Sequence, residues 1–280
     1  MTKILSKTVL AKNIFEMIVE APRVAAKAEA GHFVIVMAEE TGERIPLTIA
    51  DYDRPQGALT LVFMVVGKST LKLAQREAGG ELYALLGPLG HASAIDGGGT
   101  VVLVAGGVGT APVFPIARGF RERGARVISI QGARTKELIF WQHKLASVSD
   151  EHILMTDDGT AGRKGLVTEP LKEVLARDPA HQVKRVYAIG PTVMMRACCD
   201  VTRPFAVPTL ASLNTIMVDG TGMCGGCRVN VGGRTLFTCV DGPEFDGHQV
   251  DWPLLLSRQK IYHSEEKCAL DRYVAEGPGR

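Results

Sequence analysis

The stretch TVVLVAGGVGTAPVFPIAR, residues 100–118, decides the fold of the middle of the chain. It begins as a continuous apolar run, passes through a glycine-rich turn and continues into a helical segment from Pro112 to about Glu122. A strand-sized run without polar alternation is typical of a strand buried on both faces, as in a parallel sheet covered by helices. The stretch therefore predicts a strand, a tight turn and a helix in succession.

Further strands and helices alternate on the C-terminal side of this stretch. RVISIQGAR (126–134), HILMTDD (152–158) and RVYAIGP (185–191) are apolar strand candidates. Helical patterns separate them at residues 136–148 and 166–178. Apolar strands that alternate with helices indicate a parallel α/β sheet with helices on both faces.

The N-terminal side has a different rhythm. One helical stretch, STLKLAQREA (69–78), interrupts a series of short strand-sized segments separated by Gly and Pro. Short strands at regular spacing predict a small antiparallel barrel. The strand candidates are KILSKTVLA (3–11), IFEMIVEA (14–21), HFVIVMAEE (32–40), IPLTIADYD (45–53), ALTLVFMVVG (58–67) and ELYALLGPLG (81–90).

These patterns divide the 280 residues into three parts. We expect an all-β barrel at residues 1–97, a parallel-sheet α/β domain at 98–211, and a small module with a polar tail at 212–280. The formal net charge is +2 without a basic stripe, so neither nucleic acid nor a membrane surface is an expected partner. The longest uncharged stretch, Gly97–Ala117, is rich in Gly and broken by two prolines, and the N-terminus lacks the apolar core of a signal peptide. We therefore expect a cytoplasmic protein without a membrane span.

Glycine- or aspartate-rich turns end three of the α/β strands. A glycine-rich turn before a helix lets the backbone approach a pyrophosphate, which the N–H groups of the helix N-terminus attract. The pattern is not G-x-G-x-x-G, and strand packing alone could explain one such turn, but ligands of open α/β sheets bind along this one edge. The candidate dinucleotide-binding residues are Gly106, Gly107, Val108, Gly109, Thr110, Asp157, Asp158, Gly190, Pro191 and Met194.

Two segments of the barrel carry phosphate-binding chemistry. In ERIPLTIA, Arg44, Pro46 and Thr48 share one face of an alternating strand, and Leu47 lies within the same motif. An Arg fork suits a diphosphate and a Thr hydroxyl suits a phosphate or a flavin edge, although an ordinary edge strand with a solvated Arg explains the same pattern. VVGKSTLKLA opens a helix and offers a second anion-receptive N-terminus. Its candidate residues are Gly67, Lys68, Ser69 and Thr70.

Three cysteines in the last part have the spacing of metal ligands. Cys224 and Cys227 follow Asp219 in VDGTGMCGGC, and Cys239 comes later in TLFTCVDG. A plant-type [2Fe–2S] loop reads Cys, four residues, Cys, two residues, Cys, with a fourth Cys further on, and here Asp219 stands at the first position. The segment is therefore either a broken cluster site or one that uses a carboxylate ligand.

Other roles for these and neighbouring residues stay open from spacing alone. Cys268, or the adjacent pair Cys198 and Cys199, could supply the fourth ligand, although buried structural cysteine is the default for the pair. A zinc knuckle fits less well because a second close pair of ligands is missing. Arg134 could contact a 2′-phosphate, a pyrophosphate or solvent. Asp241, Glu244 and Asp246 form an acidic loop that could lie around the cluster or face a partner, although we expect these residues to be solvated.

The order of these motifs resembles the ferredoxin–NADP reductase superfamily. The resemblance rests on R-x-P-x-T, GKST before a helix, GPLG, AGGVGTAP and IGPTVMM, and it covers roughly the first 200 residues. DGTGMCGGCRVNVGG and FTCVDGPEFDGH narrow it to the small subunit of NADH-dependent reduced ferredoxin:NADP oxidoreductase, also described as a sulfide dehydrogenase subunit. The electron-transfer subunit of dihydroorotate dehydrogenase is a close relation that has Cys in place of Asp219.

The resemblance implies the cofactors and the partner. FAD would bind in the barrel and NAD(H) in the α/β domain, and a [2Fe–2S] cluster would be held by Asp219, Cys224, Cys227 and Cys239. Electrons would pass to or from a larger subunit of a heterodimer that carries another FAD and [4Fe–4S] clusters, where NADP and ferredoxin react. A flavin converts hydride transfer into single-electron transfer, so no acid–base catalytic residue is expected.

Three functions are compatible with the sequence. The first is the small subunit of an electron-bifurcating NADH-dependent ferredoxin:NADP oxidoreductase. The alternative is the electron-transfer subunit of an NAD-dependent dihydroorotate dehydrogenase, which Asp219 disfavours. The third, a regulator that keeps the fold but has lost redox chemistry, is disfavoured by the intact flavin and dinucleotide motifs.

Overall fold

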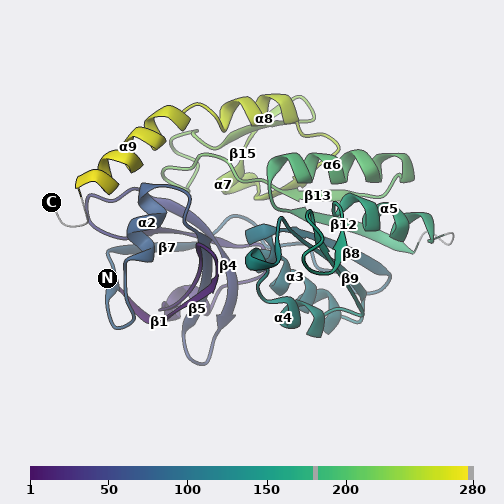
Figure 1. The fold of residues 1–280 in the computed structure, drawn as a ribbon, viewed down its shortest axis with the longest axis horizontal. Coiled ribbons are helices and arrows are strands. Elements are labelled where there is room, and N and C mark those ends of the chain that lie inside the picture. The colour runs from purple at the N-terminus through teal and green to yellow at the C-terminus, as the bar shows by residue number, and fades with distance from the viewer. Residues whose placement is uncertain (179–181, 277–280) are drawn as a thin grey trace.

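The N-terminal part forms an antiparallel sheet that curls into a nearly closed barrel (Figure 1). In this computed structural model, which describes residues 1–178 and 182–276, the strand order is β6-β1-β2-β5-β4-β3-β7. The short helices α1 (Pro22–Ala25) and α2 (Lys68–Ala74) connect strands of the barrel. The strands are β1 (Thr2–Ala11), β2 (Ile14–Glu20), β3 (Phe33–Met37), β4 (Ile45–Asp53), β5 (Ala58–Met64), β6 (Glu81–Leu82) and β7 (Ala84–Leu89).

The middle part forms a second sheet with the order β11-β10-β9-β8-β12-β13-β16. All neighbours in it are parallel except the last pair, in which β16 runs antiparallel to β13. The expected barrel and parallel-sheet architecture is confirmed. The strands are β8 (Thr100–Gly106), β9 (Arg126–Ala133), β10 (Glu151–Thr156), β11 (Arg163–Lys164), β12 (Val183–Ile189), β13 (Thr209–Ser212) and β16 (Glu244–Asp246).

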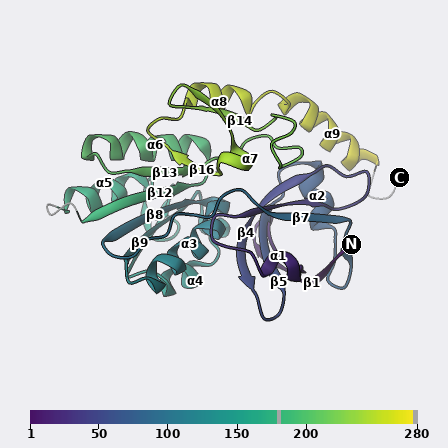
Figure 2. The same ribbon diagram turned by 180° about the vertical axis from the view of Figure 1, so that it is seen from behind.

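Helices cover both faces of this sheet, which explains why every residue of β8 is buried. Leu103 packs toward α3 (Thr110–Glu122) and α4 (Gln142–Ser147), whereas Val102 and Val104 pack toward the opposite face. That face carries α5 (Thr168–Ala176) and α6 (Thr192–Thr202), as the view from behind shows (Figure 2). The short 3₁₀ turns are η1 (Gly107–Gly109), η2 (Lys136–Leu138) and η3 (Arg203–Phe205).

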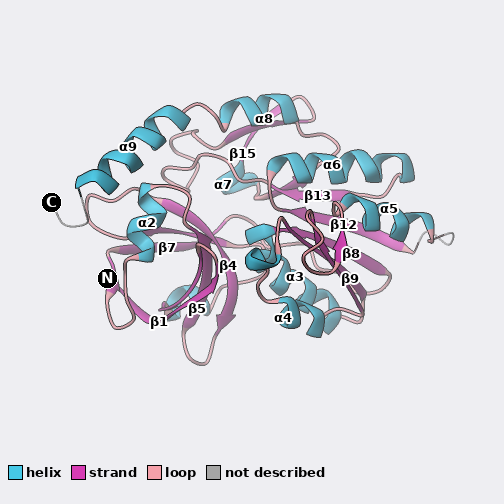
Figure 3. Cartoon of the chain, in the orientation of Figure 1, coloured by secondary structure: helices cyan, strands magenta, loops and turns pink. Residues whose placement is uncertain are grey.

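The C-terminal part is a loop followed by small elements. Residues 213–227, the cluster loop, contain no helix or strand (Figure 3). The hairpin β14 (Arg228–Val231) and β15 (Arg234–Phe237) follows, and then α7 (Thr238–Asp241). Helices α8 (Trp252–Arg258) and α9 (His263–Glu276) run from the parallel-sheet domain toward α2 of the barrel (Figure 1).

Two helical expectations differ from the structure. The segment expected to be a polar tail contains two helices, α8 and α9. The described residues of α9 include no buried side chain, so the sequence has no apolar stripe that would have indicated this helix. The helix expected at residues 136–148 is split, because Trp141 has a left-handed backbone (φ 51°) and caps α4. No helix within residues 1–178 and 182–276 is both long and apolar enough to cross a bilayer.

Candidate functional site

The dinucleotide candidates gather where the second sheet changes direction. After β8 the chain adds β9 and β10 on one side, and after crossing back it adds β12 and β13 on the other. The turns after β8 and β12 therefore diverge and leave a crevice at their carboxyl ends, which is where ligands of open α/β sheets bind. Gly107 in η1 and Pro191 before α6 flank this switch point.

The glycines of the turn divide into packing and open positions. A Cβ on Gly109 would lie 2.1 Å from the carbonyl oxygen of Ile189, and one on Gly106 would lie 2.4 Å from Sδ of Met194. Gly190 in turn lies against the backbone of Gly106. Gly107 has φ +54° and no atom within 4 Å of a built Cβ, so only this glycine faces open space. Close packing thus explains three of the four glycines, and Gly107 is the one that leaves room for a ligand.

The acidic candidates lie two strands from β8 along the same edge, at the end of β10. Asp157 and Asp158 are exposed just after β10, and the carboxylate of Asp158 accepts hydrogen bonds from the amide and hydroxyl of Thr160 at 3.0 and 2.7 Å. These bonds lower the pKa of Asp158. The backbone carbonyl of Arg134, whose side chain is exposed, accepts the amide of Asp158 at 3.3 Å. One basic and two acidic residues with exposed side chains therefore lie close together in the backbone at this edge of the sheet.

The barrel candidates follow the alternation expected of β4. Pro46 and Thr48 are half-buried on one face, whereas Leu47 is 9% exposed and lies in the barrel core. Leu47 could contribute only its backbone to a ligand. Arg44 is exposed immediately before the strand. The face with Pro46 and Thr48, with Arg44 at its start, is the part of β4 that is open to a bound group.

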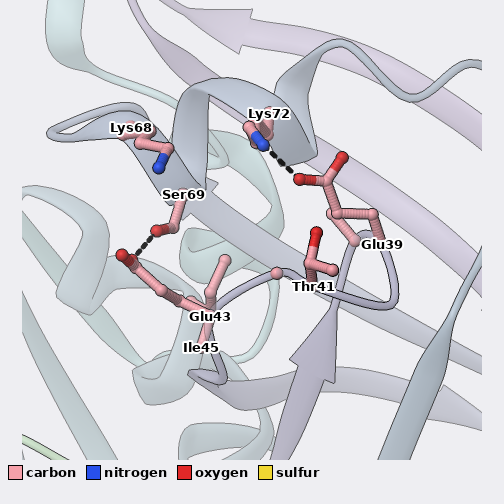
Figure 4. Close-up of a pocket in the computed structure, with 9 residues that line it drawn as sticks. Glu39, Thr41, Glu43, Ile45, Lys68, Ser69 and Lys72 are labelled. Carbon is pink, nitrogen blue, oxygen red and sulfur yellow. Dashed lines mark hydrogen bonds and ion pairs between the residues drawn. The ribbon is translucent and has the colours of Figure 1, made fainter. Parts of the chain in front are cut away.

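The second barrel segment borders a pocket between α2 and the β3–β4 loop (Figure 4). Lys68 and Ser69 line it, and the Ser69 hydroxyl donates to Glu43 across the pocket. Thr70 points the other way: its Oγ1 accepts the amides of Val66 and Gly67 at 3.0 and 3.2 Å and so caps α2. Ser69 is thus engaged with Glu43, Lys68 lines the pocket beside the carboxylates of Glu39 and Glu43, and Thr70 shapes the loop.

The cluster loop and α7 hold the four ligand candidates in two pairs. The Sγ atoms of Cys227 and Cys239 are 3.2 Å apart and both residues are buried. Asp219 Oδ2 accepts the amide of Cys224 at 2.8 Å, and Cys224 is exposed. Burial raises the pKa of the Cys239 thiol, as do the hydrogen bond with Cys227 and, to a smaller extent, the negative charge of Asp219.

This donor set fits an iron–sulfur cluster. Burial and Cys227 raise the pKa of Cys239 to about 12, so its thiol stays protonated until a metal ion displaces the proton. The amide of Gly226 donates to Cys224 Sγ at 3.4 Å, as is common around cluster sulfurs. Within residues 1–178 and 182–276, no three His, Cys, Asp or Glu side chains converge on a point suited to a single ion.

The other cysteines lie elsewhere. Cys198 and Cys199 on α6 are fully buried in the sheet core, and burial raises the pKa of Cys199 to about 12. Cys268 is exposed on α9. Cys198 and Cys199 belong to a different group of buried residues from Cys227 and Cys239, whereas Asp219 is hydrogen-bonded to Cys224.

The cluster loop packs directly on the barrel. Cys227 and Cys239 belong to one apolar group with Phe33 and Ile35 of β3. Gly220 has φ +75°, and a Cβ there would lie 2.7 Å from Ile35. The ligand candidates thus adjoin a barrel strand next to β4.

The sequence patterns did not indicate the surroundings of two acidic residues, Glu244 and Asp51. Glu244, expected to be solvated, instead accepts the Ser93 hydroxyl at 2.6 Å; the residue as a whole is half-buried but its carboxyl group is enclosed. Burial raises its pKa to about 7. Asp51 on β4 pairs with Arg118 and Lys144 of the other domain. Because their partners are distant in the sequence, local pattern gave no signal for either.

Two family profiles match the chain. The profile described as "Oxidoreductase NAD-binding domain" matches residues 103–200, and "Iron-sulfur cluster binding domain of dihydroorotate dehydrogenase B" matches residues 214–251. The first spans the glycine turn and the second spans all four ligand candidates.

Named relatives cover nearly the whole chain. The "Dihydroorotate dehydrogenase B (NAD(+)), electron transfer subunit homolog" of Thermotoga maritima is 43% identical over 274 residues, covering 98% of this chain and 96% of the relative. The electron transfer subunit of Geobacillus thermodenitrificans is 32% identical over 257 residues, covering 88% and 96%. The chain belongs to the dihydroorotate dehydrogenase B electron transfer subunit family. Members of this family are oxidoreductase subunits, as the sequence indicated.

A solved structure gives the same result for the fold of this family member. It is described as "Insights into flavin-based electron bifurcation via the NADH-dependent reduced ferredoxin-NADP oxidoreductase structure". Its TM-score is 0.91 at 42% identity, with 98% of both chains covered. The expected resemblance and the cofactor set of FAD, NAD(H) and an iron–sulfur cluster are confirmed.

Proposed function

We propose that this chain passes electrons between NAD(H), FAD and a [2Fe–2S] cluster, and exchanges them with a larger subunit of an electron-bifurcating NADH-dependent ferredoxin:NADP oxidoreductase. The whole-length match to the structure of that name supports this reading. The larger subunit would carry the second FAD and the [4Fe–4S] clusters, and ferredoxin and NADP would react there. We place the complex in the cytoplasm, where free thiol ligands persist.

One observation carries the proposal: the barrel contacts both of the other binding regions. On one side, Cys227 and Cys239 pack on Phe33 and Ile35 of β3. On the other side, Val108 of the glycine turn packs with Ile14 and Val62 of the barrel strands. A carrier bound in the barrel would therefore lie between the dinucleotide edge and the cluster loop.

The residues of the chain act by binding and orienting. A bound flavin exchanges hydride with NADH and single electrons with an iron–sulfur centre. Arg44 and Lys68 supply positive charge for its phosphates, and Pro46 and Thr48 form the open face of β4. Gly107 leaves space for the dinucleotide backbone at the sheet edge. Asp219, Cys224, Cys227 and Cys239 would hold the cluster.

Anaerobic reduction tests the proposal. Protein purified without oxygen should contain flavin, iron and acid-labile sulfide, and NADH should bleach the flavin absorbance and then produce the EPR signal of a reduced [2Fe–2S] cluster. Absence of both the flavin and the sulfide would refute it.

The names of the curated relatives favour a second candidate, the electron transfer subunit of an NAD-dependent dihydroorotate dehydrogenase. The two functions differ in the partner and its substrate. Native copurification identifies the partner, and NAD⁺ reduction driven by dihydroorotate distinguishes this candidate from ferredoxin-dependent chemistry. Asp219 at the first ligand position favours the bifurcating function.

A further inference from the structure

Asp51 joins the barrel to the dinucleotide domain through two cations. Its Oδ1 accepts Nη1 of Arg118 on α3 at 2.8 Å, and its Oδ2 accepts Nζ of Lys144 on α4 at 3.0 Å. The three side chains are only 20–33% exposed, so the pairs are partly shielded from water. One carboxylate of β4 thus holds two helices of the neighbouring domain, and we refer to Asp51, Arg118 and Lys144 as the Asp51 clamp.

Aromatic rings fix the two cations of the clamp. Lys144 Nζ lies 3.8 Å from the ring centroid of Trp141 and 4.3 Å from that of Phe114. The indole N–H of Trp141 donates to Glu16 of the barrel at 3.1 Å. Trp141 holds a left-handed backbone, φ 51°, which a large side chain adopts only when its surroundings impose it. The surroundings of Lys144 are therefore held from both domains.

The clamp adjoins the contact that places the glycine turn. Ala50, next to Asp51, is 1% exposed in an apolar group that also contains Ala111 and Phe140 of the dinucleotide domain. Val108, within the turn itself, packs against the same group. A change in the clamp would therefore shift the turn relative to β4, the strand that carries Pro46 and Thr48.

We propose that the Asp51 clamp is a positioning device that sets the distance between the bound dinucleotide and the flavin. The inference rests on the proposed function, since it assumes hydride transfer between these two sites. Reacting atoms must approach to about 3–3.5 Å for transfer, and a displacement of about 1 Å can cost on the order of 100-fold in rate. Two charge-assisted bonds on a single carboxylate restrain that approach more tightly than the apolar contact alone.

The test uses the full chain with its flavin and cluster, and the variant Asp51→Asn. The limiting rate of flavin reduction at saturating NADH should fall about 10- to 100-fold. The Kd for NADH and the flavin content should stay within about twofold of wild type. The long-wavelength charge-transfer absorbance of the NADH complex, which requires ring contact, should weaken. Amide hydrogen exchange in residues 141–147 should accelerate, which reports loosening independently of activity.

Two further variants, Asp53→Asn and Lys144→Gln, complete the test. Asp53→Asn removes a carboxylate on the same strand that accepts the nearby amide of Gln56, and NADH should reduce the flavin of this control variant at the wild-type rate. If Asp51→Asn does not retain flavin, Lys144→Gln decides, because it leaves the Arg118 bond in place. A limiting rate per bound flavin within twofold of wild type in the deciding variant overturns the proposal. Failure of NADH to reduce the wild-type flavin refutes the proposed function instead.

Discussion

The sulfur atoms of Cys227 and Cys239 lie 3.2 Å apart, although the residues are 12 positions apart in the sequence. The turn between β14 and β15 brings the chain back on itself, and Thr238 adds hydrogen bonds to the carbonyl of Cys227. The protein therefore positions this thiol pair through its own backbone. The Asp219–Cys224 pair lies on the more exposed side of the same loop.

Asp219 can be tested as a ligand by two substitutions with opposite expectations. Asp219→Ala should lose iron and sulfide, because a coordinating anion is removed. Asp219→Cys should retain the cluster, and its midpoint potential should fall by on the order of 100 mV because thiolate donates more charge than carboxylate. Metal analysis, EPR and redox titration measure these outcomes. Asp200→Asn, on the surface of α6, is the control, and an unchanged spectrum and iron content in Asp219→Ala would remove Asp219 from the coordination shell.

Gly109 and Gly107 should respond differently to alanine. A Cβ at Gly109 would overlap the Ile189 carbonyl at 2.1 Å, so Gly109→Ala should destabilise the protein by about 3 kcal/mol or more. Gly107→Ala meets no atom within 4 Å and should cost only about 1–2 kcal/mol for its left-handed backbone, while weakening NADH binding. Thermal unfolding and NADH titration separate the two effects. Equal melting temperatures for both variants would contradict this assignment of packing and binding positions.

Glu244 should make stability depend on pH. Burial raises its pKa to about 7, against an ordinary value near 4.3, so the folded state holds the proton more tightly than the unfolded state does. The contribution of Glu244 to the free energy of unfolding is fully present below about pH 4.5 and is lost as the pH rises through 7. Between pH 5.5 and pH 8 the loss should be about 2 kcal/mol, and Glu244→Gln should abolish it. Denaturant unfolding at both pH values measures the difference, with Glu81→Gln, an exposed barrel residue, as the control that keeps the wild-type slope.

Asp158 should favour NADH over NADPH. Hydrogen bonds from Thr160 lower the pKa of Asp158, so it is charged at neutral pH and would repel a 2′-phosphate at this end of the crevice. Asp158→Asn should narrow the difference between the two dinucleotides several-fold, measured as kcat/KM for flavin reduction. A faster reaction of wild type with NADPH than with NADH would show that Arg134 dominates this subsite.

Elements with strong periodicity could be predicted from the sequence. The strand expected at residues 45–53 coincides with β4, because its core-facing positions alternate with half-buried ones along the barrel wall. The helix after β8 begins at Thr110, close to the expected Pro112, since the glycine turn fixes where a helix can start. The placement of the turns after β8 and β12 at one edge of the sheet also followed, because the carboxyl ends of parallel strands lie at the same edge.

Features that depend on distant partners could not be predicted in this way. Glu244 is enclosed by Ser93, 151 positions away, and the Asp51 clamp joins residues 67 and 93 positions apart. The break at Trp141 likewise depends on Glu16 and Lys144 rather than on local helix preference. The orientation of Thr70 could not be predicted either, because a Thr at the start of a helix can cap the helix or bind a ligand. In the structure its hydroxyl accepts the amides of Val66 and Gly67.

Strand β16 pairs with β13 of the second sheet, and the cluster loop packs against β3 of the barrel. The C-terminal quarter of the chain is therefore part of the packing of both domains. Truncation near residue 212 would remove β16, the outer neighbour of β13, and would expose Phe33 and Ile35 to solvent. A protein shortened in this way should aggregate, because it exposes apolar side chains and a strand edge. Deleting the C-terminal part is therefore not enough to convert this chain into a two-domain reductase.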